Sequence, residues 1–374
     1  MDRYIQENLP VLRQLIRELC AIPAPSHEED ARAAFVKNWL ECHGAEGVFI
    51  DEAKNVIWPI HDTGSNEVAV CMAHTDTVFP DRKSMPFREE NGRYYCPGVT
   101  DDTAQLAVLL VSALFWRRQK SRCGLVIVAN SCEEGLGNLK GSRAIVERYG
   151  DRLRELVTID GTNLHQIVNK AVGSHRYRVT VMTEGGHSFE NFGRPNAIHE
   201  LSKLVASLYT LPVPAEEGSK TTFNVGTISG GTSVNTIAQE AQMLYEYRSD
   251  SKNCLAQMEA AFLETVRNAE RNGVQFRVDK IGDRPCAGAV DPQRQQALLH
   301  RAAAAVRRVT GQEPVFRSGS TDCNAALGAG VPAVCFGGCV GGGCHTREEY
   351  LELASLEQGC RLVMTFLQDY FQSE

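Results

Sequence analysis

Short apolar runs alternate with segments of helical period through the first 170 residues of the chain. Continuous short apolar runs are typical of strands buried on both faces, whereas apolar residues three and four positions apart indicate the inner face of a helix. We therefore predict strands at 68–72, 125–128 and 156–159, and helices at 31–40, 103–116 and 139–149. Ser26, three positions before Glu29, predicts a capping box at the start of the first of these helices. The alternation predicts an α/β fold with a mostly parallel sheet covered by helices on both faces.

The pattern changes between residues 173 and 286. Alternating strands are predicted at 177–181, 222–228, 241–247 and 274–278, and helices at 196–209 and 255–271. Such a block predicts a small α+β domain with helices on one side of its sheet. The earlier pattern then returns with a helix at 292–309, a strand at 331–336 and a helix at 353–371. We therefore predict a discontinuous domain, 1–172 and 287–374, interrupted by an inserted domain, 173–286.

Composition is that of a folded protein and excludes several classes. Of the 374 residues, 43% are hydrophobic and 23% are charged, which excludes a disordered chain, a coiled coil or a collagen-like fibre. The formal net charge of −7 argues against a non-specific nucleic-acid binder. The apolar run 107–116 is shorter than the roughly 20 residues of a membrane span, so we expect a core helix there. Without a signal-peptide pattern at the N-terminus, we expect a cytoplasmic protein with no nucleic-acid or membrane partner.

Residues that can carry chemistry follow the three strands predicted first. These are His74-Thr75-Asp76, Glu133-Glu134-Gly135 and Asp160-Gly161. Ligands of open α/β sheets bind beyond the carboxyl ends of the strands, so the three sets indicate one shared site. A fourth pattern, Gly98-Val99-Thr100-Asp101-Asp102, opens the helix predicted at 103–116. Singly, each pattern is more typical of polar capping or of a solvated turn; their joint placement favours a site.

These residue types suit a hydrolytic site with two metal ions. Such a site needs a bridging carboxylate, a neutral nitrogen and further carboxylates for the ions, and a separate general base. In this interpretation Asp101 bridges, His74 and Asp160 hold one ion, and Glu134 holds the other with a late histidine.

The remaining roles have candidates too. His345 follows the glycine-rich stretch 337–343, and in isolation it suits a flexible surface loop better than a ligand. Beside the other patterns we interpret it as the late histidine. Glu133 is free to take a proton from the attacking water. Asp76 is placed to bind the second ring nitrogen of His74 and fix its tautomer.

The ordered set of motifs resembles the M20 family of co-catalytic metallopeptidases over nearly the whole chain. The resemblance implies two divalent metal ions, usually zinc, although such ligands also accept cobalt or manganese. It implies the metal ligands His74, Asp101, Glu134, Asp160 and His345, the general base Glu133 and the supporting carboxylate Asp76. It also implies a cis peptide bond between Asp101 and Asp102, and a lid or dimerisation domain at 173–286.

The inserted domain carries further matches. His187 lies in a motif that resembles the lid motif whose histidine polarises the scissile carbonyl, often in the site of a partner subunit. Asn235 and Arg248 resemble groups that hold a substrate carboxylate, a role that suits the guanidinium fork. The alternatives are that His187 caps a local turn and that Arg248 pairs with a nearby acid. A homodimer through the lid domain is implied as a possible assembly.

Two departures from the family pattern affect the functional prediction. Thr103 stands where many members have lysine, so a local charge is lost. Asp160 stands where other members have glutamate, and aspartate there accompanies aminopeptidase or dipeptidase activity. We therefore favour a di- or tripeptide aminopeptidase, with an N-acyl amino acid deacylase or carboxypeptidase as the alternative. A more distant alternative is a protein that binds metal or peptide without catalysis. Ser320-Thr321-Asp322 resembles another active-site loop and has no assigned role.

Thirteen cysteines leave a thiol-based activity as another possibility. Cys132, Cys339 and Cys344 lie close in sequence to the candidate site residues. The chain has no C-x-x-C pair and no evident basic group beside these thiols, so we interpret them as reduced, small apolar side chains.

Overall fold

The computed structural model describes residues 1–60 and 66–371, and the chain divides into two compact units. Unit 1 comprises Met1–Ala171 and Gly288–Glu374, and unit 2 comprises Val172–Ala287. The sequence-based boundaries differ from these by one residue at each junction.

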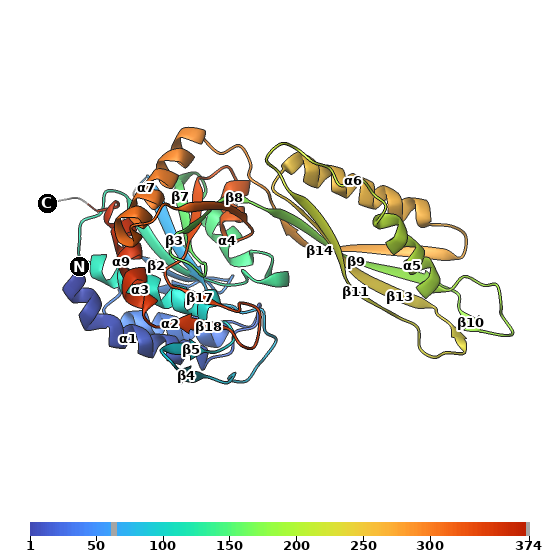
Figure 1. Ribbon diagram of the computed structural model, residues 1–374, viewed down its shortest axis with the longest axis horizontal. Coiled ribbons are helices and arrows are strands. Elements are labelled where there is room, and N and C mark those ends of the chain that lie inside the picture. Colours follow the sequence, from blue (N-terminus) through green and yellow to red (C-terminus); the bar gives the residue numbers. More distant parts are fainter. Residues whose placement is uncertain (61–65, 372–374) are drawn as a thin grey trace. The chain divides into compact units, whose positions relative to one another are not determined.

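An eight-stranded sheet forms the centre of unit 1 (Figure 1). Its order is β1 (Phe49–Ile50), β2 (Val56–Pro59), β6 (Gly124–Asn130), β3 (Val68–His74), β7 (Leu153–Ile159), β16 (Ala333–Phe336), β8 (Gln166–Ala171) and β15 (Val315–Gly319). The neighbours β6, β3, β7 and β16 are parallel to one another, and the predicted mostly parallel sheet is confirmed. Every residue of β3 is buried, which explains why its sequence is continuously apolar.

Helices cover both faces of this sheet, as the sequence predicts. Alternate residues of β3 enter two different hydrophobic clusters. Ala69 and Cys71 belong to the cluster that also contains side chains of α1 (Asp2–Cys20), α2 (Asp30–Cys42), α3 (Gln105–Trp116), α7 (Pro292–Thr310) and α9 (Ser355–Gln368). Val70 and Met72 pack with α4 (Lys140–Tyr149) and α8 (Cys323–Gly328). The helical segment Val99–Trp116 is long and apolar enough to cross a membrane, judged by length and composition alone. It lies inside unit 1, however, and is mostly buried.

Three details differ from the predictions. A π-helical turn, Val99–Ala104, precedes α3 and carries the Asp101-Asp102 pair. The predicted capping box is wrong, because α2 begins at Asp30 and Ser26 makes no cap there. The Ser26 hydroxyl instead donates to Asp76 at 2.6 Å. A small sheet of β17 (Gly341–Gly342), β18 (Tyr350–Glu352), β5 (Arg93–Tyr95) and β4 (Arg88–Glu90) was not predicted.

Unit 2 is a four-stranded antiparallel sheet with two helices on one face (Figure 1). Its order is β11 (Thr221–Gly230), β13 (Glu240–Ser249), β9 (Gly173–Thr183) and β14 (Val274–Arg284), and the helices are α5 (Ala197–Leu208) and α6 (Lys252–Ala269). A separate pair, β10 (Gly186–His187) and β12 (Thr236–Ile237), joins two loops.

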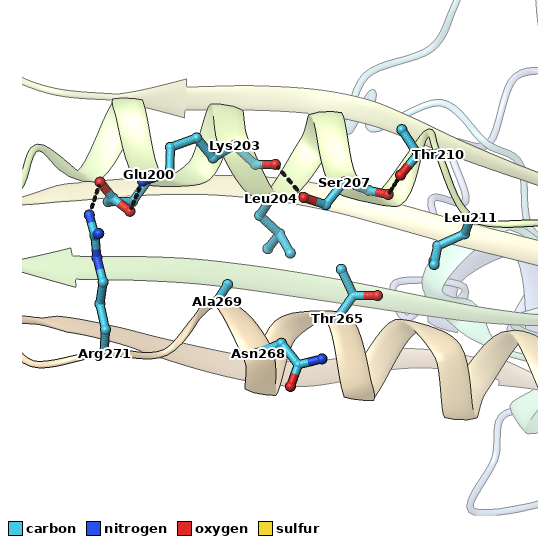
Figure 2. A pocket seen from close by; sticks show the side chains of 10 residues that line it. All are labelled: Glu200, Lys203, Leu204, Ser207, Thr210, Leu211, Thr265, Asn268, Ala269 and Arg271. Carbon is cyan, nitrogen blue, oxygen red and sulfur yellow. Dashed lines mark hydrogen bonds and ion pairs between the residues drawn. The ribbon is translucent and has the colours of Figure 1, made fainter.

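A groove of about 470 Å³ runs between α5 and α6 (Figure 2). The carboxylate of Glu200 lies in it and pairs with Lys203 at 2.8 Å and with Arg271 at 2.6 Å. The negative charge of Glu200 is thus balanced by two basic side chains. No predicted site residue lines the groove.

Candidate active site

The predicted ligands lie at the carboxyl ends of four adjacent parallel strands. His74 is the last residue of β3, Asp160 follows β7 directly, and Glu134 follows β6 by four positions. His345 lies in the glycine-rich loop after β16. Because β6, β3, β7 and β16 are neighbours in the sheet, their ends meet at one edge.

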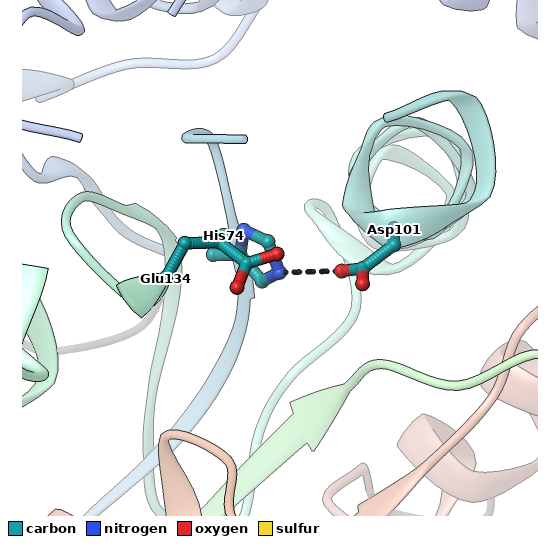
Figure 3. A group of neighbouring side chains, drawn as sticks. All are labelled: His74, Asp101 and Glu134. Atoms are coloured by element: carbon teal, nitrogen blue, oxygen red, sulfur yellow. Dashed lines mark hydrogen bonds and ion pairs between the residues drawn. The ribbon is translucent and has the colours of Figure 1, made fainter. Parts of the chain in front are cut away.

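Asp101 lies between the two histidines. Its Oδ1 is 3.0 Å from Nε2 of His74, and its Oδ2 is 3.1 Å from Nε2 of His345 (Figure 3 shows the His74 contact). His345 is also 3.2 Å from Oε1 of Glu134. One carboxylate thus faces an imidazole with each oxygen, the arrangement needed to bridge two cations. The Asp101–Asp102 peptide bond is cis, as predicted.

Asp76 organises the surroundings of His74. Nδ1 of His74 lies 3.0 Å from the Asp76 backbone carbonyl and 3.4 Å from its carboxylate, so the backbone makes the closer contact. This leaves Nε2 to face Asp101. The Asp76 carboxylate accepts hydrogen bonds from the backbone N–H groups of Glu133 at 2.9 Å and Glu134 at 3.0 Å. Asp76 therefore fixes both glutamates as well as the histidine.

Two groups of side chains offer atoms close enough to hold a cation. The first is His74, Asp101 and Glu134, and the second is His74, Asp102 and Asp160, with the candidate atoms of each group within 4.8 Å of one another. Asp102 was not predicted as a ligand. Its Oδ2 accepts from the backbone N–H of His74 at 2.8 Å, and its buried Oδ1 has no hydrogen-bond partner among the described residues. A buried carboxylate oxygen of this kind fits a site that holds cations.

The ionisable groups of the site also favour the binding of cations. Burial raises the pKa of Asp102 and Asp160 well above the usual value, and neighbouring acids add to the effect. Burial also raises the pKa of Glu134 to about 7, helped by Asp101 and Glu133. Hydrogen bonds to Asp101 and Glu134 raise the pKa of His345 to about 10. Without a cation, the cluster is therefore stable only with bound protons.

We expect divalent metal uptake to release protons from this cluster. Imidazole binds metal in its neutral form, and burial of ionised carboxylates is favourable once a cation is present. Metal affinity should consequently fall as the pH is lowered below 7. Calorimetric titration of the metal-free protein in buffers of different ionisation enthalpy measures the number of protons released. An unchanged apparent enthalpy across buffers would contradict this prediction.

Glu133 is placed apart from the two ligand groups. It is 5% exposed, and neither group of candidate ligand atoms includes it. Its backbone is held by Asp76 beside Glu134. The position fits a base rather than a ligand.

Two buried charged residues that were given no role from the sequence support the site. Glu349 is fully buried and accepts hydrogen bonds from the backbone N–H groups of Gly98, Thr100 and Asp101, all at 2.8–2.9 Å. It ties the segment after His345 to the turn that carries Asp101. No periodicity or spacing identifies such a contact, because the partners are backbone groups about 250 positions away.

Arg32, in the first turn of α2, is the second such residue. It is 2% exposed and donates to the carbonyls of Thr75 at 2.8 Å and Leu19 at 2.9 Å, and also to that of Ile22. Its Nη1 is 3.5 Å from Oγ1 of Thr103. The charge that appeared lost at position 103 is thus supplied by another helix.

Replacing Arg32 by Met should weaken both metal binding and folding. Three carbonyls, two of them on buried residues, lose a donor, which costs about 2 kcal/mol or more of unfolding free energy. The His74–Asp76 segment also loses its support, and loss of such outer contacts weakens metal binding by ~10- to 100-fold. Urea unfolding and metal titration measure the two effects. The double variant R32M/T103K should regain part of the metal affinity, whereas R32M/T103M should not; equal affinities would contradict this role.

Asp322 lies close to the site as well. It is 2% exposed, and its carboxylate accepts from the Asn130 side chain at 2.6 Å, at the end of β6. Burial and the charge of Glu133 raise its pKa to about 7. The Ser320-Thr321-Asp322 loop therefore supports the strand end from which Glu133 emerges.

The three cysteines that lie close in sequence to the site give no support to a thiol mechanism. All thirteen are free. Burial raises the pKa of Cys132 to about 12, and it also raises those of Cys339 and Cys344. Thiols in this state are poor nucleophiles at neutral pH.

The predicted lid residues lie in unit 2. His187 and Asn235 are brought together by β10 and β12, where the Ser188 N–H donates to the Asn235 carbonyl at 3.0 Å. Nδ1 of His187 accepts from the N–H groups of Phe189 at 3.3 Å and Glu190 at 3.5 Å, so it does cap a local turn. In the neutral ring this leaves the proton on Nε2. Arg248, on β13, pairs with Glu246 through two hydrogen bonds, at 2.9 and 3.1 Å.

Known proteins are similar to this chain in sequence and in fold. The succinyl-diaminopimelate desuccinylase of Corynebacterium glutamicum is 24% identical, over 95% of each chain. A tripeptidase of Staphylococcus aureus superposes with a TM-score of 0.76 at 21% identity, covering 97% of this chain and 98% of the other. A dinuclear metal-binding M20 peptidase of Bacillus subtilis superposes with a TM-score of 0.64 at 16% identity, covering 98% and 100%.

The family assignment comes from the sequence itself. The profile of peptidase family M20/M25/M40 matches residues 70–369, which include most of β3, the strands β6, β7 and β16, and all the predicted ligands. Members of this family are hydrolytic enzymes, and the carboxylate and histidine cluster described above fits divalent metal ions. The chain therefore belongs to peptidase family M20/M25/M40.

Proposed function

We propose that the protein hydrolyses amide bonds in small peptides, as a di- or tripeptide aminopeptidase that uses two divalent ions, usually zinc in this family. The observation that carries the proposal is the position of Asp101, with one oxygen facing His74 and the other facing His345. With Asp101 as the bridge, Asp160 and His74 would hold one ion, and Glu134 and His345 the other. Asp102 faces the first of these positions.

When bound, the ions would lower the pKa of a water molecule and polarise the scissile carbonyl. Glu133 takes a proton from the attacking water and returns it to the leaving amine. Asp76 holds Glu133 and His74 in position through its hydrogen bonds. The Nε2–H of His187 is available to donate to the carbonyl oxygen as negative charge develops there.

Two observations bear on the substrate. The short Asp160 side chain, where other members carry glutamate, supports an aminopeptidase, as does the fold shared with the tripeptidase. The desuccinylase relative, which matches over 95% of both chains, favours an N-acyl amino acid deacylase as the second candidate. The two differ in whether the substrate has a free amino group.

Substrates with and without a free amino group distinguish the aminopeptidase from the deacylase. Free tripeptides and their N-acetyl derivatives are compared at matched concentration after the metal-free protein is loaded with zinc, cobalt or manganese. An aminopeptidase cleaves the free peptides and leaves the blocked ones intact, whereas a deacylase releases the acyl group. Full activity after chelation would refute the metal-dependent proposal.

We also propose that unit 2 pairs with a second copy and that the protein acts in the cytoplasm. Phe189 and Phe192 are 86% and 90% exposed on the loop that carries His187, which supports a contact surface. The thirteen free cysteines suit a reducing compartment. Light scattering of wild type and F189S/F192S tests the dimer: a monomeric wild type would contradict it.

A further inference from the structure

Arginines gather on one face of the unit-2 sheet around the carboxylate of Glu246. Glu246 on β13 stands opposite Arg176 on β9. Ser174, two positions before Arg176, stands opposite both Arg248 on β13 and Arg284 on β14. Residues two apart along a strand share a face, so Arg176, Arg248, Arg284 and Glu246 project from the same side.

This side is the one opposite the helices. Tyr177, Tyr245 and Tyr247 alternate with the charged residues along β9 and β13 and pack against Phe262 of α6. The arginines therefore point away from the hydrophobic core of unit 2.

Local contacts hold the arginine side chains in place. Arg248 binds both oxygens of Glu246, and Nε of Arg176 donates to one of them at 3.2 Å. Arg284 is 5% exposed. Gly282 leaves room for the Arg176 stem, because a Cβ at 282 would lie 3.1–3.2 Å from its Cδ and Cβ atoms.

The positive charges of this group repel one another. The pKa of Arg176 is lowered by burial and by the neighbouring Arg284 and Arg248, and the attraction of Glu246 does not offset these effects. Guanidinium groups held together in this way bind anions well, because an anion relieves the repulsion and a carboxylate matches the fork.

We propose that Arg176, Arg248 and Arg284 form a site for a ligand with two negative charges, namely a substrate that carries a second carboxylate, such as a peptide with an acidic C-terminal residue. The inference rests on the proposed function and on the role that the resemblance implies for Arg248, which is to hold one substrate carboxylate. Arg176 and Arg284 then hold the second. Glu246 keeps the guanidinium groups in place without ligand and competes with the ligand for them.

Two probes that differ by one charge test the site by direct binding. Glutarate has two carboxylates, and its monoamide has one. Calorimetry on the full-length protein should show glutarate binding at least ~10-fold more tightly than the monoamide, as expected for an added charge-assisted contact.

Variants distinguish a binding site from a structural cluster. R176Q should abolish the preference for glutarate, and R176K should retain part of it. E246Q should act in the opposite direction and raise glutarate affinity several-fold, because the competing carboxylate is gone. R178Q is the matched control: Arg178 is exposed, two positions along β9, and its loss should leave both affinities unchanged.

Equal affinity of the wild type for the two probes would overturn the proposal. The same holds if R176Q and E246Q weaken glutarate binding equally. Turnover gives a separate readout, because tripeptides that end in Glu should have a kcat/KM at least ~10-fold above those that end in Gln. If neither peptide is cleaved, the proposed function fails, while the glutarate titrations still decide the anion site.

Discussion

Replacing Glu133 by glutamine is expected to lower kcat by ~10²- to 10⁴-fold, the usual contribution of a general base. The glutamine keeps the shape of the side chain and the backbone hydrogen bond from residue 133 to Asp76. What it loses is the ability to take a proton from water. Because Glu133 lies outside both groups of candidate ligands, the bound metal should remain at two ions per chain.

The neighbouring residue provides the contrast. E134Q removes a charge of the same kind one position away. The Glu134 carboxylate, however, lies 3.2 Å from His345 in the candidate metal site, so metal content should fall along with activity. Elemental analysis after gel filtration and steady-state kinetics separate the two variants. Wild-type turnover in E133Q, or loss of its metal, would contradict the assignment of the base.

Replacing Asp101 by asparagine should have the largest effect on the metal site. Asp101 faces both histidines, so its charge bears on both ions, and both histidines would lose their shared partner. We expect both ions to be lost on dialysis and kcat/KM to fall by ~10³-fold or more, since metal activation contributes several kcal/mol.

Asp160 allows a graded comparison. It belongs to the group with Asp102 and not to the group with Asp101 and Glu134, so D160N should lose one ion and retain the other. Metal stoichiometry is measured for both variants under the same dialysis. An equal loss in D101N and D160N would contradict the bridging position of Asp101.

The positions of the predicted ligands follow from features that the sequence displays directly. His74, Glu134 and Asp160 each come at or just after a short apolar run, and such runs become buried parallel strands whose ends share one edge. His345 was identified only with the help of the other motifs, because the strand before it is short. The mostly parallel sheet and its covering helices follow from the same alternation.

Other parts of unit 1 could not be predicted, for physical reasons. The contacts of Arg32 and Glu349 are with backbone groups distant in sequence, which no local pattern specifies. The edge strand β15 is largely exposed and thus lacks the apolar pattern that identifies a buried strand. Ser26 resembles a helix cap, but Asp76 provides a buried carboxylate that its hydroxyl binds instead. Tertiary contacts there outweigh a local preference.

The place of β16 in the sheet has a consequence for biosynthesis. This strand lies between β7 and β8, pairing with one in parallel and with the other in antiparallel fashion, yet it is translated only after the whole of unit 2. Until it leaves the ribosome, the mostly buried strand β7 has an unpaired edge and β8 lacks this partner, and unpaired edges of this kind associate with other chains. We therefore expect the central sheet of unit 1 to be completed only after unit 2 has been synthesised, so that association with other chains is favoured most during that interval.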